Sequence, residues 1–263
     1  MSTLVTNLQQ NPSPPHSVTV QGAFEPFDLQ IARNQIMGHN HLDLFGYSTV
    51  VGSTAMGPLW EGLTSSGGNY PFPTSAAQIV VVSSSASDTA VTMVISGLDA
   101  NFLPITESVA LNGTTNVTTV KSFLRINNVT TTAGNAVGIV TFKNASTTIA
   151  QVNAGLGQTQ MSVYTVPAGY TLYITYFQAD GNTTTTSGAY MNTRLRTTLN
   201  PSGVVLVSGQ STFLTNLQIP YGVPVEIAEK TDFEFQFQGS GGAGSRQNCY
   251  VGGYLIKNDG QTA

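Results

Sequence analysis

The sequence predicts an all-β protein, an antiparallel jelly-roll-like β-sandwich with an extended N-terminal arm. Three observations indicate this fold: residues 231–238 alternate between polar side chains and Phe, short apolar runs recur along the chain, and Gly, Asn, Asp and Pro stand between these runs. An alternation with a period of two separates two faces only on an extended backbone. Many short strands with turn residues between them are typical of sandwiches and barrels.

Taken in chain order, residues 1–75 are predicted to form the arm and an adapter segment, and residues 76–263 the sandwich domain. Residues 11–15, Asn-Pro-Ser-Pro-Pro, disfavour both a helix and a central strand, so the extreme N-terminus is expected to be extended. Residues 27–35 alternate between apolar and polar side chains at their start and are expected to form a strand. No helix of three turns is predicted.

Within the sandwich domain, turn residues separate the predicted strands. Asn112-Gly113 favours a tight hairpin, because both residues tolerate a positive φ. Pro167 suits the first central position of a second turn. Residues 78–130 are therefore predicted to form a meander. The predicted strands cover residues 78–83, 90–97, 104–111, 116–130, 136–142, 147–152, 160–166, 170–177, 189–198, 203–213, 231–238 and 247–257.

The composition argues against several classes of function. Only 8% of the residues are charged, against roughly 25% in an ordinary soluble domain. Nine Lys and Arg at a net charge of −4 cannot form a basic stripe along phosphates, so no nucleic-acid partner is expected. No apolar run approaches the ~20 residues of a membrane-spanning helix, and residues 1–17 contain no secretory signal. Cys249 is the only cysteine and is expected to be a buried, inert thiol.

The best metal candidates are His39, His41 and Asp43, since an extended backbone places all three side chains on one face. The segment resembles the opening of the metallo-β-lactamase pattern but has Leu44 where that pattern has a further His. A polar strand edge or a subunit contact is the favoured interpretation, so neither a metal nor a cofactor is expected.

No catalytic or cofactor-binding residues are predicted, because the chain lacks a nucleophile elbow, a phosphate loop and a zincin helix. The Gly-rich run 239–244 matches the dinucleotide fingerprint, but strand-like residues follow it in place of the required helix. The Gly-rich run 239–245 and the Thr-rich run 182–187 are predicted to be exposed loops.

Acidic residues cluster near the C-terminus, which raises the alternative of a hydrolase with a carboxylate pair. Asp232 and Glu234 are its best candidates, but both are expected on the solvent face of their strand. Arg194 and Arg196 share one strand face and can pair with these carboxylates across strands or subunits. A solvated face or a subunit contact is therefore the favoured interpretation.

Several segments between residues 78 and 257 carry a family resemblance. They are residues 83–90 (SSSASDTA), 95–101 (ISGLDAN), 106–115 (TESVALNGTT), 122–126 (SFLRI), 157–161 (GQTQM), 164–170 (YTVPAGY) and 229–232 (EKTD). In these segments the chain resembles a family of tailed-bacteriophage virion structural proteins that includes head-decoration and neck and tail accessory proteins. The resemblance implies a β-sandwich on the particle and carries over no catalytic residues.

The resemblance implies a non-enzymatic component of a tailed-bacteriophage virion, assembled in the host cytoplasm. Its expected partners are other virion proteins of the capsid, neck or tail, and further copies of itself, with a trimer favoured. The neutral surface of Thr, Ser, Asn and Gln fits this role, because copies can lie side by side with little repulsion. The N-terminal arm is expected to add a strand to the sheet edge of a neighbouring subunit.

The alternative function is a host-receptor or glycan-binding tail module. The faces of aromatic side chains can stack on sugars, although most of these residues are better explained as core or interface. The candidates are Tyr170, Tyr173, Tyr176, Phe177, Tyr190 and Tyr250.

Overall fold

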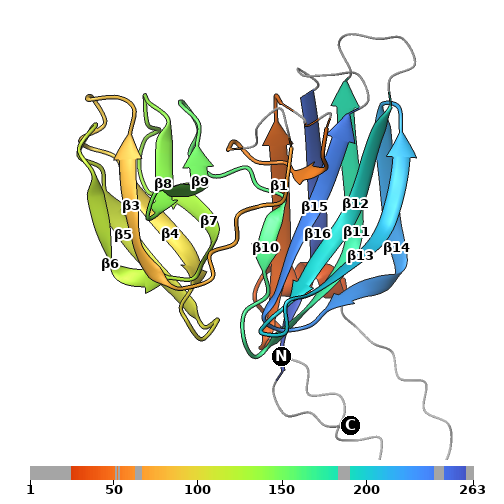
Figure 1. Ribbon diagram of the computed structural model, residues 1–263. Coiled ribbons are helices and arrows are strands. Elements are labelled where there is room, and N and C mark those ends of the chain that lie inside the picture. Colours follow the sequence, from red (N-terminus) through yellow and green to blue (C-terminus); the bar gives the residue numbers. More distant parts are fainter. Residues whose placement is uncertain are drawn as a thin grey trace, which may run out of the picture.

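The computed structural model describes residues 25–50, 52, 54–62, 67–182, 190–239 and 246–258, and its regular secondary structure consists of antiparallel strands apart from one short helix (Figure 1). The predicted all-β fold is confirmed. Parts of three predicted segments lie outside the described residues: residues 1–24 of the arm, residues 183–187 of the Thr-rich loop and residues 240–245 of the Gly-rich loop. The elements are α1 Phe27–Ala32, β1 His39–Ser48, β2 Gly57–Pro58, β3 Ala77–Ser83, β4 Thr92–Leu98, β5 Pro104–Ala110, β6 Val117–Phe123, β7 Arg125–Thr131, β8 Val140–Asn144, β9 Thr147–Val152, β10 Val163–Thr165, β11 Tyr170–Asn182, β12 Met191–Leu199, β13 Val204–Phe213, β14 Asn216–Ile227, β15 Thr231–Gly239 and β16 Arg246–Lys257.

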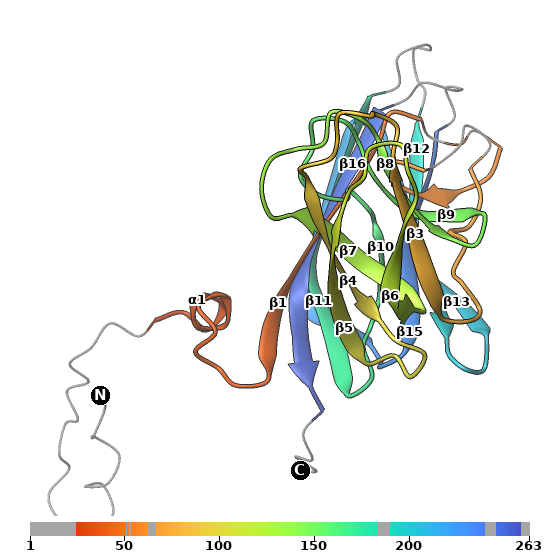
Figure 2. The same ribbon diagram turned by 90° about the vertical axis from the view of Figure 1, so that its left-hand side faces the viewer.

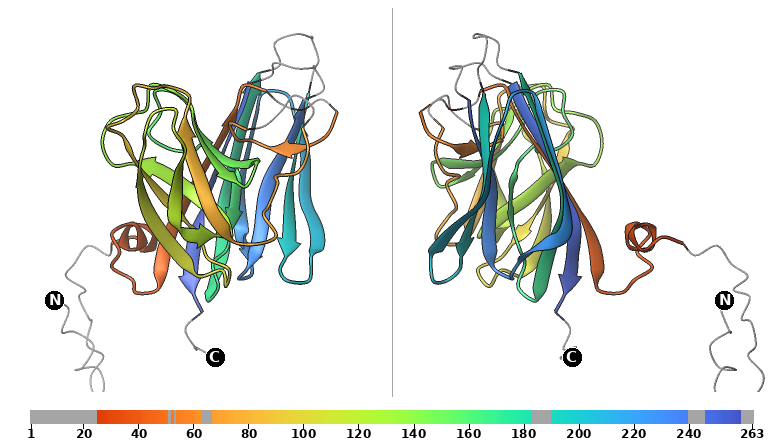
Figure 3. Two further views of the ribbon diagram at one scale, coloured as in Figure 1. Left: turned by 60° about the vertical axis from the view of Figure 1, so that its left-hand side comes forward. Right: turned by 90° about the vertical axis from the view of Figure 1, so that its right-hand side faces the viewer.

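The strands form two sandwiches that lie side by side, and in the chain the strands of one are inserted between β2 and β10 of the other (Figures 1 and 3). The inserted sandwich has sheets of order β6-β3-β8-β9 and β5-β4-β7. The main sandwich has sheets of order β1-β16-β11-β14 and β10-β15-β12-β13, with β2 added beside β15. The chain therefore starts the main sandwich, builds the inserted one over β3–β9, and then completes the main one. Each sandwich has its own apolar core.

The division that the sequence predicts at residue 75 does not follow the course of these sheets. Strand β1 lies within the predicted adapter, yet it pairs with β16 from His39↔Ile256 to Ser48↔Gln247. Its inward side chains, among them Leu42 and Leu44, belong to the main core. The adapter segment therefore supplies an edge strand of the main sandwich.

The strand predicted over residues 27–35 is wrong, because residues 27–32 form the short helix α1. Of the alternating apolar residues, only Ile31 is buried, whereas Phe27 and Leu29 are about half exposed. Pro26 precedes the helix and Asp28 lies in its first turn, where a fixed φ and a negative charge both favour helix initiation. No described helix is long and apolar enough to cross a membrane.

The meander predicted over residues 78–130 is also wrong, because the chain alternates between the two sheets of the inserted sandwich. Strands β3 and β6 lie in one sheet, and β4, β5 and β7 in the other. The predicted strand over 116–130 is divided at Leu124 into β6 and β7. Strands β4 and β5 form a hairpin, and Asp99 Oδ1 closes its loop by accepting from the Leu103 N–H at 2.9 Å.

The alternating strand predicted over residues 231–238 is confirmed as β15, and its Phe face fills the main core. Phe233, Phe235 and Phe237 are buried, and Phe177 of β11 stacks on Phe235 with ring centroids 4.4 Å apart. Cys249 lies in the same core as expected, and burial raises the pKa of its thiol to about 12.

Two buried glutamines of the main sandwich differ in their partners. Gln236 donates to Asn69 Oδ1 at 2.8 Å and accepts from Arg194 Nε at 2.7 Å. Gln247 is 1% exposed, and among the described residues neither polar atom of its amide has a hydrogen-bond partner. A buried amide without partners costs roughly 1–3 kcal/mol.

The substitution Gln247→Met is therefore expected to raise the free energy of unfolding by about 1 kcal/mol, because it removes an amide that has no partner. The same change at the paired position, Gln236→Met, is expected to lower it by about 1–3 kcal/mol, because Arg194 and Asn69 lose their partner. Urea denaturation of both variants measures the difference. Equal losses of stability at both positions would contradict this interpretation.

Candidate functional site

The outer face of β15 carries a buried polar layer at the junction of the two sandwiches. Asp232, Glu234 and Gln236 point away from the Phe core, yet each is at most 2% exposed. The expectation that Asp232 and Glu234 face solvent is therefore wrong. Residues of β7 and of the segment before β3 contact this face and exclude water from it.

Asp232 forms a bidentate ion pair with Arg125 of the inserted sandwich. The Arg125 Nε to Asp232 Oδ1 distance is 2.7 Å, and Nη2 to Oδ2 is 2.8 Å. Thr165 Oγ1 donates to Oδ1 at 2.6 Å, and Asn200 Nδ2 donates to Oδ2 at 2.8 Å. Parallel pairing of this kind adds geometric specificity to the electrostatic attraction. The pair therefore fixes β7 against β15.

The remaining guanidinium surface of Arg125 is also occupied. Its Nη1 donates to the carbonyl oxygen of Pro73 at 2.6 Å, and the rings of Phe72 and Phe102 lie 5.1 and 5.6 Å from its Cζ. Gly97 permits the close approach of β7, because a Cβ there would lie 2.0 Å from the Arg125 carbonyl oxygen. Arg125 is thus held by Asp232 of the main sandwich, by its own sandwich and by the segment before β3.

A second ion pair of this layer joins Glu234 to Arg196 within the main sandwich. Glu234 Oε1 lies 2.7 Å from Arg196 Nη1, and Glu234 Oε2 accepts from the Tyr70 backbone N–H at 3.0 Å. Burial raises the pKa of Glu234, while the Tyr70 N–H and Arg196 act in the opposite direction. The expected pairing of Arg196 with these carboxylates is confirmed between neighbouring strands β12 and β15, and the ion pair is largely buried. Arg194 instead donates to Gln236.

This arrangement removes the geometric basis of the hydrolase alternative. A glycosidase needs two carboxyl groups that flank the scissile bond. A cleft of about 720 Å³ borders the junction, and Asp232 lines it beside Arg125 and Asn200, but Glu234 does not. The oxygens of Asp232 are held by Arg125, Thr165 and Asn200, so both carboxylates serve the junction.

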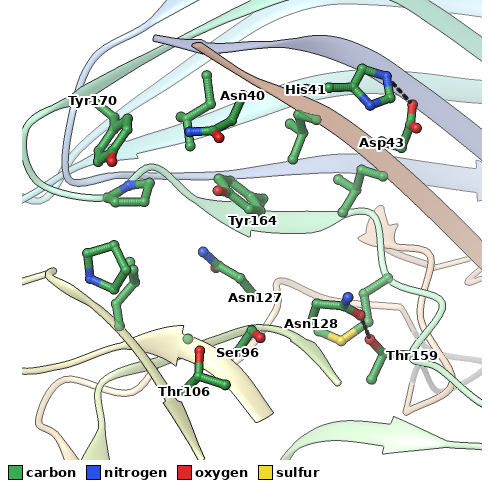
Figure 4. Close-up of a pocket in the computed structure, with 18 of the residues that line it drawn as sticks. Asn40, His41, Asp43, Ser96, Thr106, Asn127, Asn128, Thr159, Tyr164 and Tyr170 are labelled. Atoms are coloured by element: carbon green, nitrogen blue, oxygen red, sulfur yellow. Dashed lines mark hydrogen bonds and ion pairs between the residues drawn. The ribbon is translucent and has the colours of Figure 1, made fainter. Parts of the chain in front are cut away.

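A second cleft, of about 570 Å³, lies between β1 and strands β4, β5 and β7 of the inserted sandwich (Figure 4). Amides and hydroxyls form much of its wall, including Ser96, Thr106 and Asn128. Asn127 is committed to the fold, because it donates to the Thr165 carbonyl oxygen at 2.9 Å and accepts from the Thr165 N–H at 3.0 Å. The cleft therefore offers neutral hydrogen-bonding groups.

The metal candidates lie on β1, and the structure brings two of the three together. His41 Nε2 is 3.1 Å from Asp43 Oδ1 at the wall of this cleft (Figure 4). Tyr250 OH donates to the same carboxylate. His39 instead places Nδ1 3.1 Å from the Met37 carbonyl oxygen. In the part of the chain that the structure describes, no three or more His, Cys, Asp or Glu side chains form a group that could hold a metal ion.

The sugar-stacking candidates do not form one platform. Phe177 is a core residue, and Tyr170 lines the cleft of Figure 4. Tyr176 and Tyr250 lie together on neighbouring strands, with ring centroids 6.1 Å apart. Tyr190 is 45% exposed. Among these candidates, only Tyr170 lines this cleft.

The structure reveals one surface that the sequence analysis did not single out, the edge strand β13. Among the described strands its only sheet neighbour is β12. Four consecutive residues, Val204–Val207, are each about half exposed, and residues 197–225 contain no Asp, Glu, Lys or Arg. The run Val-Val-Leu-Val without alternating polar residues was the available signal.

No protein family matches the chain, and no curated protein matches it significantly. Solved structures that it resembles include the VP2 subviral particle of infectious bursal disease virus, at 14% identity over 89% of this chain and 78% of that chain, with a TM-score of 0.20. The Gx strain of the same virus matches at 12% identity over 94% and 80% of the two chains, with a TM-score of 0.19. Such scores are too low to establish a common fold.

The junction gives a direct prediction for stability. Asp232→Asn leaves the buried Arg125 guanidinium without its counter-charge and is expected to lower the free energy of unfolding by about 3–5 kcal/mol. The control Glu226→Gln removes an exposed carboxylate of β14 and is expected to change it by less than about 0.5 kcal/mol. Urea denaturation measures both, and a near-neutral Asp232→Asn would show that the ion pair does not stabilise the fold.

Glu61, which follows β2, gives a prediction for pH dependence. Burial raises the pKa of its carboxyl from 4.5 to about 8, although the Gln160 N–H donates to it at 3.1 Å. Because the folded-state pKa exceeds the unfolded one, its favourable contribution is complete below about pH 4.5 and is lost as pH rises through about 8. Glu61→Gln is expected to abolish this part of the pH dependence. Parallel stability profiles of the parent and the variant in urea denaturation across this range would refute it.

Proposed function

We propose that this chain is a non-enzymatic structural component of a tailed-bacteriophage virion, a homo-oligomeric head-decoration or neck and tail accessory protein. The observation that carries the proposal is the open, uncharged edge β13 on a rigid double sandwich. Sheet edges are normally protected by charges, prolines or cover, because unpaired edges associate. An edge without this protection fits a protein that works by association.

The strand order of the main sandwich supports the same function. Without the two-residue β2, its eight strands, numbered 1 to 8 in chain order from β1 to β16, form sheets of order 1-8-3-6 and 2-7-4-5. We infer that this is a jelly roll, an architecture that recurs in viral capsid and lectin domains. A fold alone does not define a function, so the surfaces must distinguish the two classes.

The chemistry of the surfaces favours structure over catalysis. The candidate carboxylates Asp232 and Glu234 form buried ion pairs with Arg125 and Arg196, so they are not free for catalysis. The low charge content of the chain lets many copies lie close together. Partners are other virion proteins and further copies of the chain, with assembly in the host cytoplasm. A trimer is favoured, because capsids offer local threefold sites.

Purified particles and purified protein test this proposal together. The chain is expected in the virion as an ordered component at one symmetric location in electron-microscopy reconstructions, and as a trimer by light scattering of the purified protein. Absence from washed particles, together with a monomer at all concentrations, would overturn the proposal. Turnover of any polysaccharide by the purified chain would overturn its non-enzymatic part.

A host-receptor or glycan-binding tail module is the second candidate, and the cleft of Figure 4 favours it. The cleft combines uncharged amides and hydroxyls with Tyr170 and Tyr164, the groups that hydrogen-bond and stack on a neutral sugar. A glycan array with the purified chain tests it. A specific ligand whose binding is lost in Tyr170→Ala would favour this function, and the absence of any ligand would favour the structural one.

A further inference from the structure

The main sandwich has four sheet edges, and three of them are covered or blocked. Strand β1 is contacted by α1 and faces β4, β5 and β7 of the inserted sandwich across the cleft of Figure 4, and β10 is tied to β7 through the hydrogen bonds between Asn127 and Thr165. Strand β14 carries Pro220 and Pro224, which have no N–H to offer a further strand. In the described part of the chain, β13 has neither prolines nor a covering element.

The exposed residues of β13 lie on both of its faces. Consecutive side chains of a strand point in opposite directions, yet Val204, Val205, Leu206 and Val207 are 48%, 46%, 51% and 50% exposed. Both faces of the strand are therefore open at this end, at the edge remote from the inserted sandwich (Figure 1). An added strand would supply backbone hydrogen bonds and cover apolar surface at the same time.

The occupant of this edge should itself be uncharged and extended, because residues 197–225 offer no charge for an ion pair. Residues 1–24 of the chain contain no Asp, Glu, Lys or Arg. Residues 2–10, Ser-Thr-Leu-Val-Thr-Asn-Leu-Gln-Gln, include Leu4, Val5 and Leu8 among small or amide side chains and contain neither Gly nor Pro. This segment therefore matches β13 in its lack of charge, and Thr3, Val5 and Thr6 favour an extended backbone.

The position of α1 determines the side of the main sandwich from which the N-terminal residues extend. The ring of Phe27 packs edge-on against Tyr254 and His39, and Tyr254 OH donates to Asp28. Helix α1 stands to one side of the main sandwich beyond β1, whereas β13 lies at the opposite edge (Figure 2). Pro12, Pro14 and Pro15 favour an extended spacer, and residues 11–24 can span up to about 46 Å.

We propose that residues 2–10 of one copy pair as an added strand with the β13 edge of a neighbouring copy. The donor segment and the acceptor edge are different surfaces, so the contact is head-to-tail and can close into a ring. This inference rests on the proposed homo-oligomeric function and names the contact that would build the trimer.

Hydrogen exchange of the β13 amides tests the pairing. In the full chain the amides of residues 204–213 are expected to exchange at least about tenfold more slowly than in a chain lacking residues 1–11, and the truncated chain is expected to be a monomer. Truncation leaves both cores intact, since residues 25–258 supply them. A synthetic peptide of residues 1–11 is expected to restore protection of β13 in the truncated chain, and the same peptide with Val5→Pro is not.

Matched substitutions on two edges complete the test. Val205→Lys on β13 is expected to abolish both trimer formation and peptide binding, whereas Val223→Lys on β14, at a residue 83% exposed, is expected to change neither. If the truncated chain remains an oligomer with slowly exchanging β13 amides, the inference is overturned, and two β13 edges pair with each other instead. If the β13 amides of the full chain exchange slowly in a monomer, the inference is also overturned, and residues 2–10 pair with β13 of their own chain. If the chain is found on particles but the peptide does not bind, only this inference fails, and the proposed function stands.

Discussion

The bidentate ion pair between Arg125 and Asp232 is the interaction on which the arrangement of the molecule depends. It joins β7 of the inserted sandwich to β15 of the main one, in a layer from which water is excluded. Breaking a buried pair leaves an uncompensated charge, so the layer tolerates only one relative placement of the two sandwiches. Apolar packing reinforces it, because Met161 and Val163, before and within β10, belong to the inserted core.

The same layer determines which surfaces are left for function. Its ion pairs engage the acidic residues that a hydrolase would need. The surfaces that remain are a cleft lined largely by amides and hydroxyls on one side of the junction, and the uncharged edge β13 at the far side of the main sandwich. A rigid body with few surface charges and an unprotected edge has the properties of an assembly subunit. Binding energy in such a subunit comes from backbone pairing and apolar cover rather than from ion pairs.

Local alternation predicted most strands, since a period of two is written in neighbouring residues. It predicted β15 but not the burial of Asp232, because Arg125 comes from a strand 107 residues away in sequence. Strand β14 was missed, because Pro220 and Pro224 interrupt its pattern and are tolerated only at an edge. The insertion of one sandwich between strands of the other could not be predicted from local pattern either, because it depends on the pairing of β1 with β16 at the other end of the sequence.

Differential scanning calorimetry of the full chain measures most directly whether the two sandwiches form one unit. A junction held by buried ion pairs requires a single transition in which the calorimetric and van't Hoff enthalpies agree for each subunit, with both sandwiches melting together. Two separate transitions in the full chain, both unchanged when Arg125 and Asp232 are replaced together by apolar residues, would contradict the claim that the junction couples the two sandwiches.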